Sequence, residues 1–221
     1  MIQIVTNHFK EDLEWLKTSK YPVVVIEKEG ADPSCITPQH IMPNRGRETS
    51  SYIKYIIENY DKLPEHVAFI HGHEKSHHQR HTHHLFDVID GANVTEYGFI
   101  SLNNLYTAYP FADEDMSLPS GLMEIKKFWD KFEMPMKKPP HYFTIHVALG
   151  AQFIVSKERI LKHPKTLYER WYSIIMEEAE NKQWPHCFEA TWHIIFGEFW
   201  QDAQCDEWFK FKHTRIWTRT I

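Results

Sequence analysis

The chain has 221 residues, which is enough to bury the core of one large domain or two small ones without disulfides. Charged residues make up 25% and hydrophobic residues 42%, as in ordinary soluble globular proteins, and no run of 18 apolar residues predicts a membrane span. A formal net charge of −5 argues against a general nucleic-acid binder, because that function needs a basic surface.

The cysteines and the first residues indicate the compartment. Cys35, Cys187 and Cys205 are an odd number without a pairing pattern, which is typical of a reducing compartment. The chain opens without a basic segment followed by a long apolar one, so no secretory signal is expected. We therefore expect a cytoplasmic protein.

The first elements predict a parallel sheet. Residues 2–5 and 22–26 are apolar and rich in β-branched side chains, which predicts two buried strands. Between them, residues 10–16 carry apolar side chains at helical spacing behind acidic ones, which predicts a helix. The order strand, helix, strand opens an α/β fold, and ligands bind such sheets at loops like the one that holds Asn7, His8 and Phe9.

An amphipathic helix is predicted for residues 48–60, where apolar side chains recur every three or four positions. It follows a proline-containing loop over residues 30–43. Arg45 and Arg47 stand just before its amino terminus, where free N–H groups help to bind phosphate. Surface salt bridges are the alternative for both arginines.

A histidine-rich stretch follows the strand predicted for residues 67–70. Seven of the chain's 16 histidines fall within residues 71–84. In His71-Gly72-His73, two imidazoles at the tip of a strand could converge on one divalent ion, and Gly72 leaves the backbone room to turn. No zinc motif of the Cys-x-x-Cys or His-Glu-x-x-His type is present. Polar filler in an exposed loop is the alternative, above all for the later histidines.

The carboxyl half mixes short elements with proline-rich connections. Residues 85–118 predict a strand or short helix with connectors, and residues 134–140 an extended surface loop. Ser156 is placed to cap a helix. The other predicted elements are helices over 124–132 and 168–180, strands over 142–148 and 150–155, and a carboxyl-terminal strand or arm over 200–221.

Glu189 and His193 form a second chemical candidate. They stand four residues apart on one face of a helix predicted for residues 188–197, which ends at Gly197. A pair on the helix surface is one interpretation. Among the apolar neighbours Trp192, Ile194 and others, however, a buried charged pair would be expensive without a function.

Several blocks of the sequence resemble, in order, an uncharacterised domain family found in fungi and large DNA viruses. The blocks are residues 10–16, 44–48, 52–53, 56–64, 69–73, 151–160 and 192–197. That family is in turn similar to the GT-A glycosyltransferases, which use a nucleotide-sugar donor and a divalent ion. The resemblance implies one domain over residues 1–221, an α/β fold with a Rossmann-like, mixed and mostly parallel sheet flanked by helices. It also implies the host cytoplasm for a viral protein.

The resemblance implies a complete site. A UDP-sugar or GDP-sugar would be the donor, and a glycan or protein the acceptor. His71 and His73 stand where typical members have Asp-x-Asp, and His193 matches a carboxyl-terminal histidine that closes on the metal, expected to be manganese, with magnesium or zinc as alternatives. Glu189 matches the acidic residue near the acceptor and would act as general base. Asn7, His8, Phe9, Arg45, Arg47 and Gln152 would bind the donor.

Two other functions stay open at this point. A metal-dependent hydrolase would use the same histidines to activate water. A catalytically inactive glycan-binding module would have kept the fold and lost Asp-x-Asp.

Overall fold

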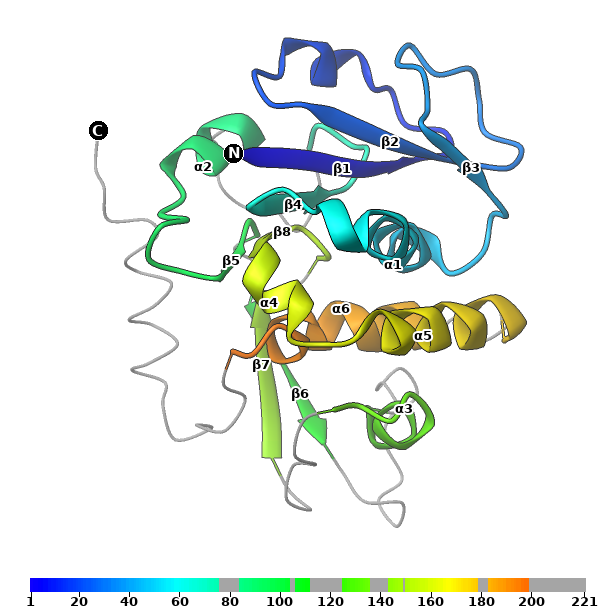
Figure 1. Ribbon diagram of the computed structural model, residues 1–221, viewed down its shortest axis with the longest axis vertical. Coiled ribbons are helices and arrows are strands. Elements are labelled where there is room, and N and C mark those ends of the chain that lie inside the picture. The colour runs from blue at the N-terminus through cyan, green and yellow to red at the C-terminus, as the bar shows by residue number, and fades with distance from the viewer. Residues whose placement is uncertain are drawn as a thin grey trace.

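A six-stranded mixed sheet forms the centre of the protein (Figure 1). The computed structural model describes residues 1–75, 84–103, 106–111, 125–135, 143–148, 150–178 and 183–198. The strand order is β3-β2-β1-β4-β8-β5, and all strands but β8 run in the same direction. The strands are β1 (Ile2–His8), β2 (Val23–Lys28), β3 (His40–Met42), β4 (His66–Ile70), β5 (Phe99–Ser101) and β8 (Phe153–Ser156).

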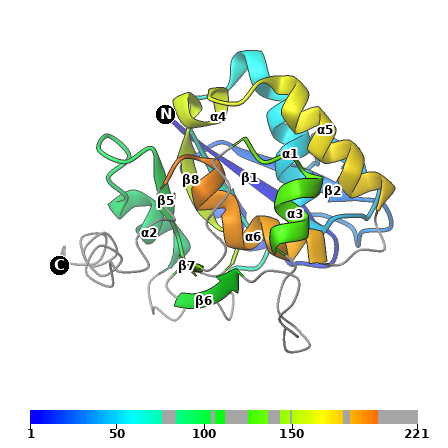
Figure 2. The same ribbon diagram turned by 90° about the horizontal axis from the view of Figure 1, so that it is seen from below.

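Helical segments cover both faces of this sheet, as Figure 1 shows. Seen from below in Figure 2, α5 runs beside α1 and α6 crosses the same side of the sheet. The segments are η1 (Glu14–Thr18), α1 (Arg47–Asn59), η2 (Tyr60–Lys62), α2 (Leu85–Gly91), α3 (Ile125–Lys131), α4 (Lys157–Leu161), α5 (Lys165–Glu177) and α6 (Gln183–Ile195). A separate antiparallel pair is formed by β6 (Tyr106–Phe111) and β7 (Phe143–Ala148).

The core has two parts, one on each face of the sheet. Neighbouring strand residues point to opposite faces, so Val5 packs with α1, α5 and α6 while Ile4 packs with η1 and α2. The larger part is aromatic. Tyr52 of α1 lies 4.7 Å from Phe69 between ring centroids, and Phe153 lies 5.6 Å from Trp192 of α6. These contacts fix α1 and α6 against β4 and β8.

Most of the predicted elements are confirmed. The α/β class, the Rossmann-like, mostly parallel sheet and the parallel pairing of β1 with β2 agree with the sequence patterns. Ser156 caps α4 by accepting a hydrogen bond from the Arg159 N–H (3.3 Å). Gly197, with a φ of 83°, follows the end of α6 as expected.

Three local predictions are wrong or incomplete. The helix expected over residues 10–16 is replaced by the short 3-10 segment η1, which begins only at Glu14. Ahead of it, the Glu11 side chain accepts a hydrogen bond from the Phe9 N–H (2.7 Å). The predicted loop over 30–43 contains the edge strand β3, and only residues from Phe153 onward pair in the predicted strand 150–155. Most of the histidine cluster, residues 136–140 of the predicted loop and the arm over 200–221 lie outside the described residues.

Candidate functional site

The carboxyl ends of β1, β2 and β4 meet at one edge of the sheet, where open α/β sheets bind ligands. The amino terminus of α1 lies at the same edge, because Lys28 at the end of β2 donates to the Ser50 Oγ in the first turn of the helix (2.7 Å). The residues predicted from strand ends and from the start of α1 therefore lie at one edge.

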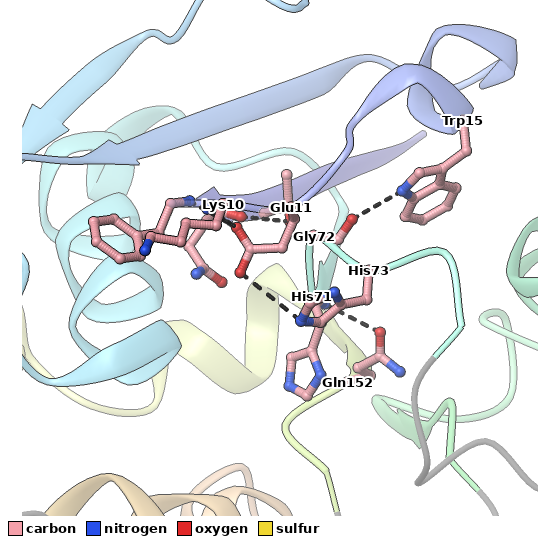
Figure 3. Close-up of polar contacts among 10 residues, drawn as sticks. Lys10, Glu11, Trp15, His71, Gly72, His73 and Gln152 are labelled. Atoms are coloured by element: carbon pink, nitrogen blue, oxygen red, sulfur yellow. Dashed lines mark hydrogen bonds and ion pairs between the residues drawn. The ribbon is translucent and has the colours of Figure 1, made fainter. Parts of the chain in front are cut away.

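His71, the first residue after β4, is held by a buried amide network (Figure 3). Its N–H donates to the Gln152 Oε1 (3.1 Å), and the Gln152 Nε2 donates to the Asn103 Oδ1 (2.9 Å). The Asn103 amide in turn donates to the Gly150 carbonyl. Gln152 is fully buried, and both ends of its amide contact protein. Its structural role is to hold the end of β4. A direct contact between Gln152 and a nucleotide-sugar donor stays a prediction.

Several charged groups act on the His71 imidazole, and Glu48 and Glu189 have the largest effects among them. Burial lowers the pKa of His71, while the charges of Glu48 on α1 and Glu189 on α6 oppose that lowering. Burial also raises the pKa of Tyr52 well above its ordinary value, and the same two carboxylates add to the effect. Tyr52 donates to the Ala151 carbonyl (2.9 Å), so it ties α1 to the segment before β8. We call these three partly buried residues, His71, Glu48 and Glu189, the acid–imidazole cluster.

Glu189 and His193 lie one turn apart on α6, as predicted. The Glu189 side chain is 11% exposed, and its Oε2 lies 3.5 Å from the Nδ1 of the more exposed His186. Phe188 and Trp192 on the same helix are buried in the aromatic core, which fixes the helix rotation. A carboxylate in this position can accept a proton from a bound hydroxyl group.

The His73 side chain faces a different carboxylate, that of Glu11. Its imidazole is 61% exposed, and its Nε2 lies 3.9 Å from the Glu11 Oε1. The Trp15 indole donates to the Gly72 carbonyl (2.9 Å), which fixes the turn between the two histidines. Figure 3 shows His73 directed to Glu11 and the His71 ring directed away from it.

The three predicted metal ligands do not gather around one point. Within the described part of the chain, no group of three or more histidine, cysteine, aspartate or glutamate side chains is placed to hold a metal ion. His71 turns into the acid–imidazole cluster while His73 faces Glu11, so these two do not form a ligand group with His193. The manganese, magnesium or zinc ion itself stays a prediction.

The two predicted arginines flank a tight turn before α1. Gly46 and Arg47 both have left-handed backbone conformations, with φ of 66° and 50°. The Arg45 Nη1 donates to the Met176 carbonyl on α5 (2.9 Å), so Arg45 fastens the turn to that helix. Arg47 is exposed at the first position of α1, whose N-cap Gly46 gives no side-chain hydrogen bond. Arg47 is thus the better placed of the two for an anion.

The end of β1 lies at the same edge, and β1 extends to His8, so the strand is longer than predicted and Asn7 and His8 belong to it rather than to a loop. The His8 side chain is 1% exposed, and its Nδ1 lies 3.6 Å from the Oε2 of Glu27, its register partner on β2. The Phe9 carbonyl accepts from the Asp32 N–H (2.7 Å). The carbonyl of Asn7 lies against Gly72, 2.9 Å from the position that a Cβ would take there. Asn7 and His8 therefore border the end of β4 and of β2.

Sequence reasoning missed Glu48, Lys28 and Glu27. Glu48 has the ordinary pattern of an acid in the first turn of a helix, so nothing in the sequence indicates that its charge acts on His71. Lys28 and Glu27 extend a strand that was expected to end at residue 26. The rule that ligands bind at the carboxyl ends of parallel strands could have drawn attention to both.

The fold and the site define a Rossmann-like α/β protein with a partly buried acid–imidazole cluster at the carboxyl edge of its sheet. The chain belongs to the family described as "Protein of unknown function (DUF3431)", whose model matches residues 3–210. No curated protein matches the chain. None of the helices in the described ranges is both long and apolar enough to cross a membrane.

Proposed function

We propose that the protein is a GT-A type glycosyltransferase that moves a sugar from a nucleoside-diphosphate sugar to a glycan or protein acceptor. One observation carries the proposal: the start of α1 and His71 lie at the carboxyl edge of a Rossmann-like sheet, where the charge of Glu189 on α6 acts on the His71 imidazole. This edge is where such sheets bind nucleotides. The domain would be formed by the whole chain of 221 residues.

The donor would lie across the ends of β1 and β2. Asn7, at the end of β1, and Phe9, just after it, are partly exposed and would contact the nucleoside. His8 is 1% exposed, so it would act indirectly by supporting this edge. The diphosphate would lie at the start of α1, where N–H groups and the exposed Arg47 offer positive charge. Arg45 would act indirectly, since its guanidinium already donates to Met176.

Glu189 would act as the general base in a transfer with inversion. Its carboxylate takes the proton of the acceptor hydroxyl while that oxygen forms a bond to the anomeric carbon. The bond from the anomeric carbon to the diphosphate oxygen breaks, and the nucleoside diphosphate leaves with the electron pair. The start of α1 stabilises the negative charge that develops on the leaving group.

The residues predicted to hold a metal ion do not fit a common ion, because His71 and His73 face different groups. No step of the transfer is therefore assigned to a metal. Activity measured with manganese, with magnesium, with zinc and with a chelator tests the metal prediction independently.

Replacement of Glu189 by glutamine tests the assignment. The Glu189→Gln variant should lose about 100-fold or more in kcat, the range of a lost general base, and keep its affinity for the donor. The measurement is the release of nucleoside diphosphate from UDP- and GDP-sugars in the presence of glycan acceptors. Glu169→Gln, an exposed position on α5, is the matched control and should behave as wild type.

The same assay separates the other two functions. Sugar released only to water would replace the transferase by a hydrolase. Glycan binding by a folded protein that never turns over a donor would replace it by a binding module. Full activity of Glu189→Gln would remove Glu189 from the mechanism.

A further inference from the structure

Lys28, at the end of β2, is an almost fully buried lysine. Its side chain is 1% exposed, and lysines are rarely buried to that extent unless they have partners. The Nζ donates to the Ser50 Oγ (2.7 Å) and to the Arg45 carbonyl (3.2 Å), and lies 3.4 Å from the Met42 Sδ. An ammonium has three donors, and these three acceptors match them.

The partners of Lys28 belong to the turn that begins α1. The Ser50 hydroxyl reaches the carbonyls of both Arg45 (2.5 Å) and Arg47 (3.0 Å). In this turn, the φ angles of Gly46 and Arg47 are 66° and 50°. This conformation is costly for a non-glycine residue such as Arg47 unless the surrounding structure enforces it. Lys28 and Ser50 together provide that enforcement from the side of the sheet.

The helix α5 holds the turn from the other side. A Cβ on Gly46 would clash with the Ile175 Cγ2, so the turn is pressed against α5. The Arg45 guanidinium adds its hydrogen bond to Met176. The position of the first turn of α1 relative to the sheet edge therefore depends on Lys28 on one side and α5 on the other.

The charge of Lys28 changes near neutral pH. Burial lowers its pKa to about 7, and the carboxylate of Glu48 on α1 opposes this lowering. The other groups around the Nζ, from β3 and the turn, are the uncharged atoms of Met42, Ser50 and Arg45 described above. A bound anion near the start of α1 would favour the ammonium form.

We propose that Lys28 is a positioning residue for the donor diphosphate: its ammonium holds the turn of Arg45, Gly46 and Arg47 and adds positive charge beneath the start of α1. Affinity for a diphosphate then falls when Lys28 loses its proton. The inference rests on the proposed function and goes beyond it, since Lys28 itself is too deeply buried to belong to the surface that meets a substrate.

The test compares Lys28→Met with wild type. Methionine keeps the length and the apolar stem but removes the donors and the charge. Lys62→Met, an exposed lysine at the opposite end of α1, is the matched control. The probes are UDP-glucose and GDP-mannose, whose diphosphates do not titrate near neutral pH, and affinity is measured by calorimetry. Two values of pH are used, about 6 and about 8.5, on either side of the lysine titration.

The expected result has two parts. At the lower pH, Lys28→Met should bind the probe about tenfold more weakly than wild type, because the turn loses its support and the site loses a nearby positive charge. Raising the pH should weaken probe binding by the wild type more than it weakens probe binding by Lys28→Met. Lys62→Met should show the same pH dependence as wild type. Equal affinity and equal pH dependence of Lys28→Met and wild type would overturn the inference and leave the proposed function standing.

A second measurement distinguishes failure of the inference about Lys28 from failure of the proposed donor site. If wild type binds neither probe, the proposed donor site is contradicted, and hydrogen exchange of the backbone amides from Gly46 to Thr49 then decides the role of Lys28. Faster exchange in Lys28→Met than in Lys62→Met would support Lys28 as the residue that holds the turn. Identical exchange would refute it.

Discussion

Lys28 shows how one buried charge links stability to pH. Its pKa falls from the ordinary 10.5 to about 7 because burial disfavours the ammonium. A pKa difference of one between the folded and the unfolded chain corresponds to about 1.4 kcal/mol of stability. Below pH 7 both the folded and the unfolded chain carry the proton, so folding bears the full cost of burying the charge. Between pH 7 and 10.5 the folded chain binds fewer protons, and this cost disappears as pH rises.

The stability of Lys28→Met should therefore depend on pH relative to wild type. The variant gains most over wild type near pH 6, and its advantage should shrink by a few kcal/mol towards about pH 9.5. Urea unfolding of both proteins over this range measures the difference. A difference that stays constant with pH would show that Lys28 titrates normally in the folded protein.

Gly72 shows why the turn after β4 admits no side chain. A Cβ there would lie 2.9 Å from the Asn7 carbonyl oxygen and 2.9 Å from the Glu11 Cβ. Gly72→Ala should lower the free energy of unfolding by about 1–3 kcal/mol, the usual cost of overpacking. Gly91→Ala is the control, because its Cβ would meet no atom within 4 Å. Equal unfolding free energies for the two variants would contradict the close approach of the two loops.

His71 and His73 show a limit of predicting side-chain directions from sequence spacing. Residues two apart point to one side only while the chain remains a strand, and β4 ends at Ile70, before His71. Gly72 then turns the chain, so His73 reaches Glu11 and His71 enters the acid–imidazole cluster. The sequence could indicate that these histidines stand at the site, but not where each imidazole points.

At the scale of the element, amphipathic spacing and capping were good guides. The helix predicted over 48–60 is α1, and Ser156 caps α4 where a serine before charged residues predicted a helix start. Short elements were harder. A 3-10 segment such as η1 is decided by a few hydrogen bonds, here from the Leu16 N–H to the Leu13 carbonyl (3.0 Å) and from the Ser19 N–H to the Leu16 carbonyl (3.1 Å), and these leave no periodic pattern.

The Ser156 cap gives a prediction for one element. Ser156→Ala removes the acceptor for the Arg159 N–H, and the variant should lose about 1 kcal/mol in the free energy of unfolding. Ser173→Ala, at an exposed bond to Glu177 within α5, is the control and should lose less than about 0.5 kcal/mol. Chemical unfolding measures both. A cap without energetic value would give the two variants equal stability.

For the whole molecule, the class of fold could be predicted but the strand order could not. Apolar strands alternating with helices predict a mostly parallel sheet. The insertion of antiparallel β8 between β4 and β5 depends on pairing over long distances, such as Phe69 with Phe153, which no local pattern encodes. The same holds for the site: Glu48 and Glu189 are 141 positions apart in the sequence, and both act on His71 only because α1 and α6 pack against the same sheet.

Calorimetric titration of the protein with UDP and GDP, with and without manganese, tests the central claim most directly. A nucleotide-sugar site at the start of α1 predicts saturable binding of at least one nucleotide, weakened about tenfold in Arg47→Gln by the loss of a charge-assisted contact. A folded wild-type protein that binds neither nucleotide under either condition would contradict the claim.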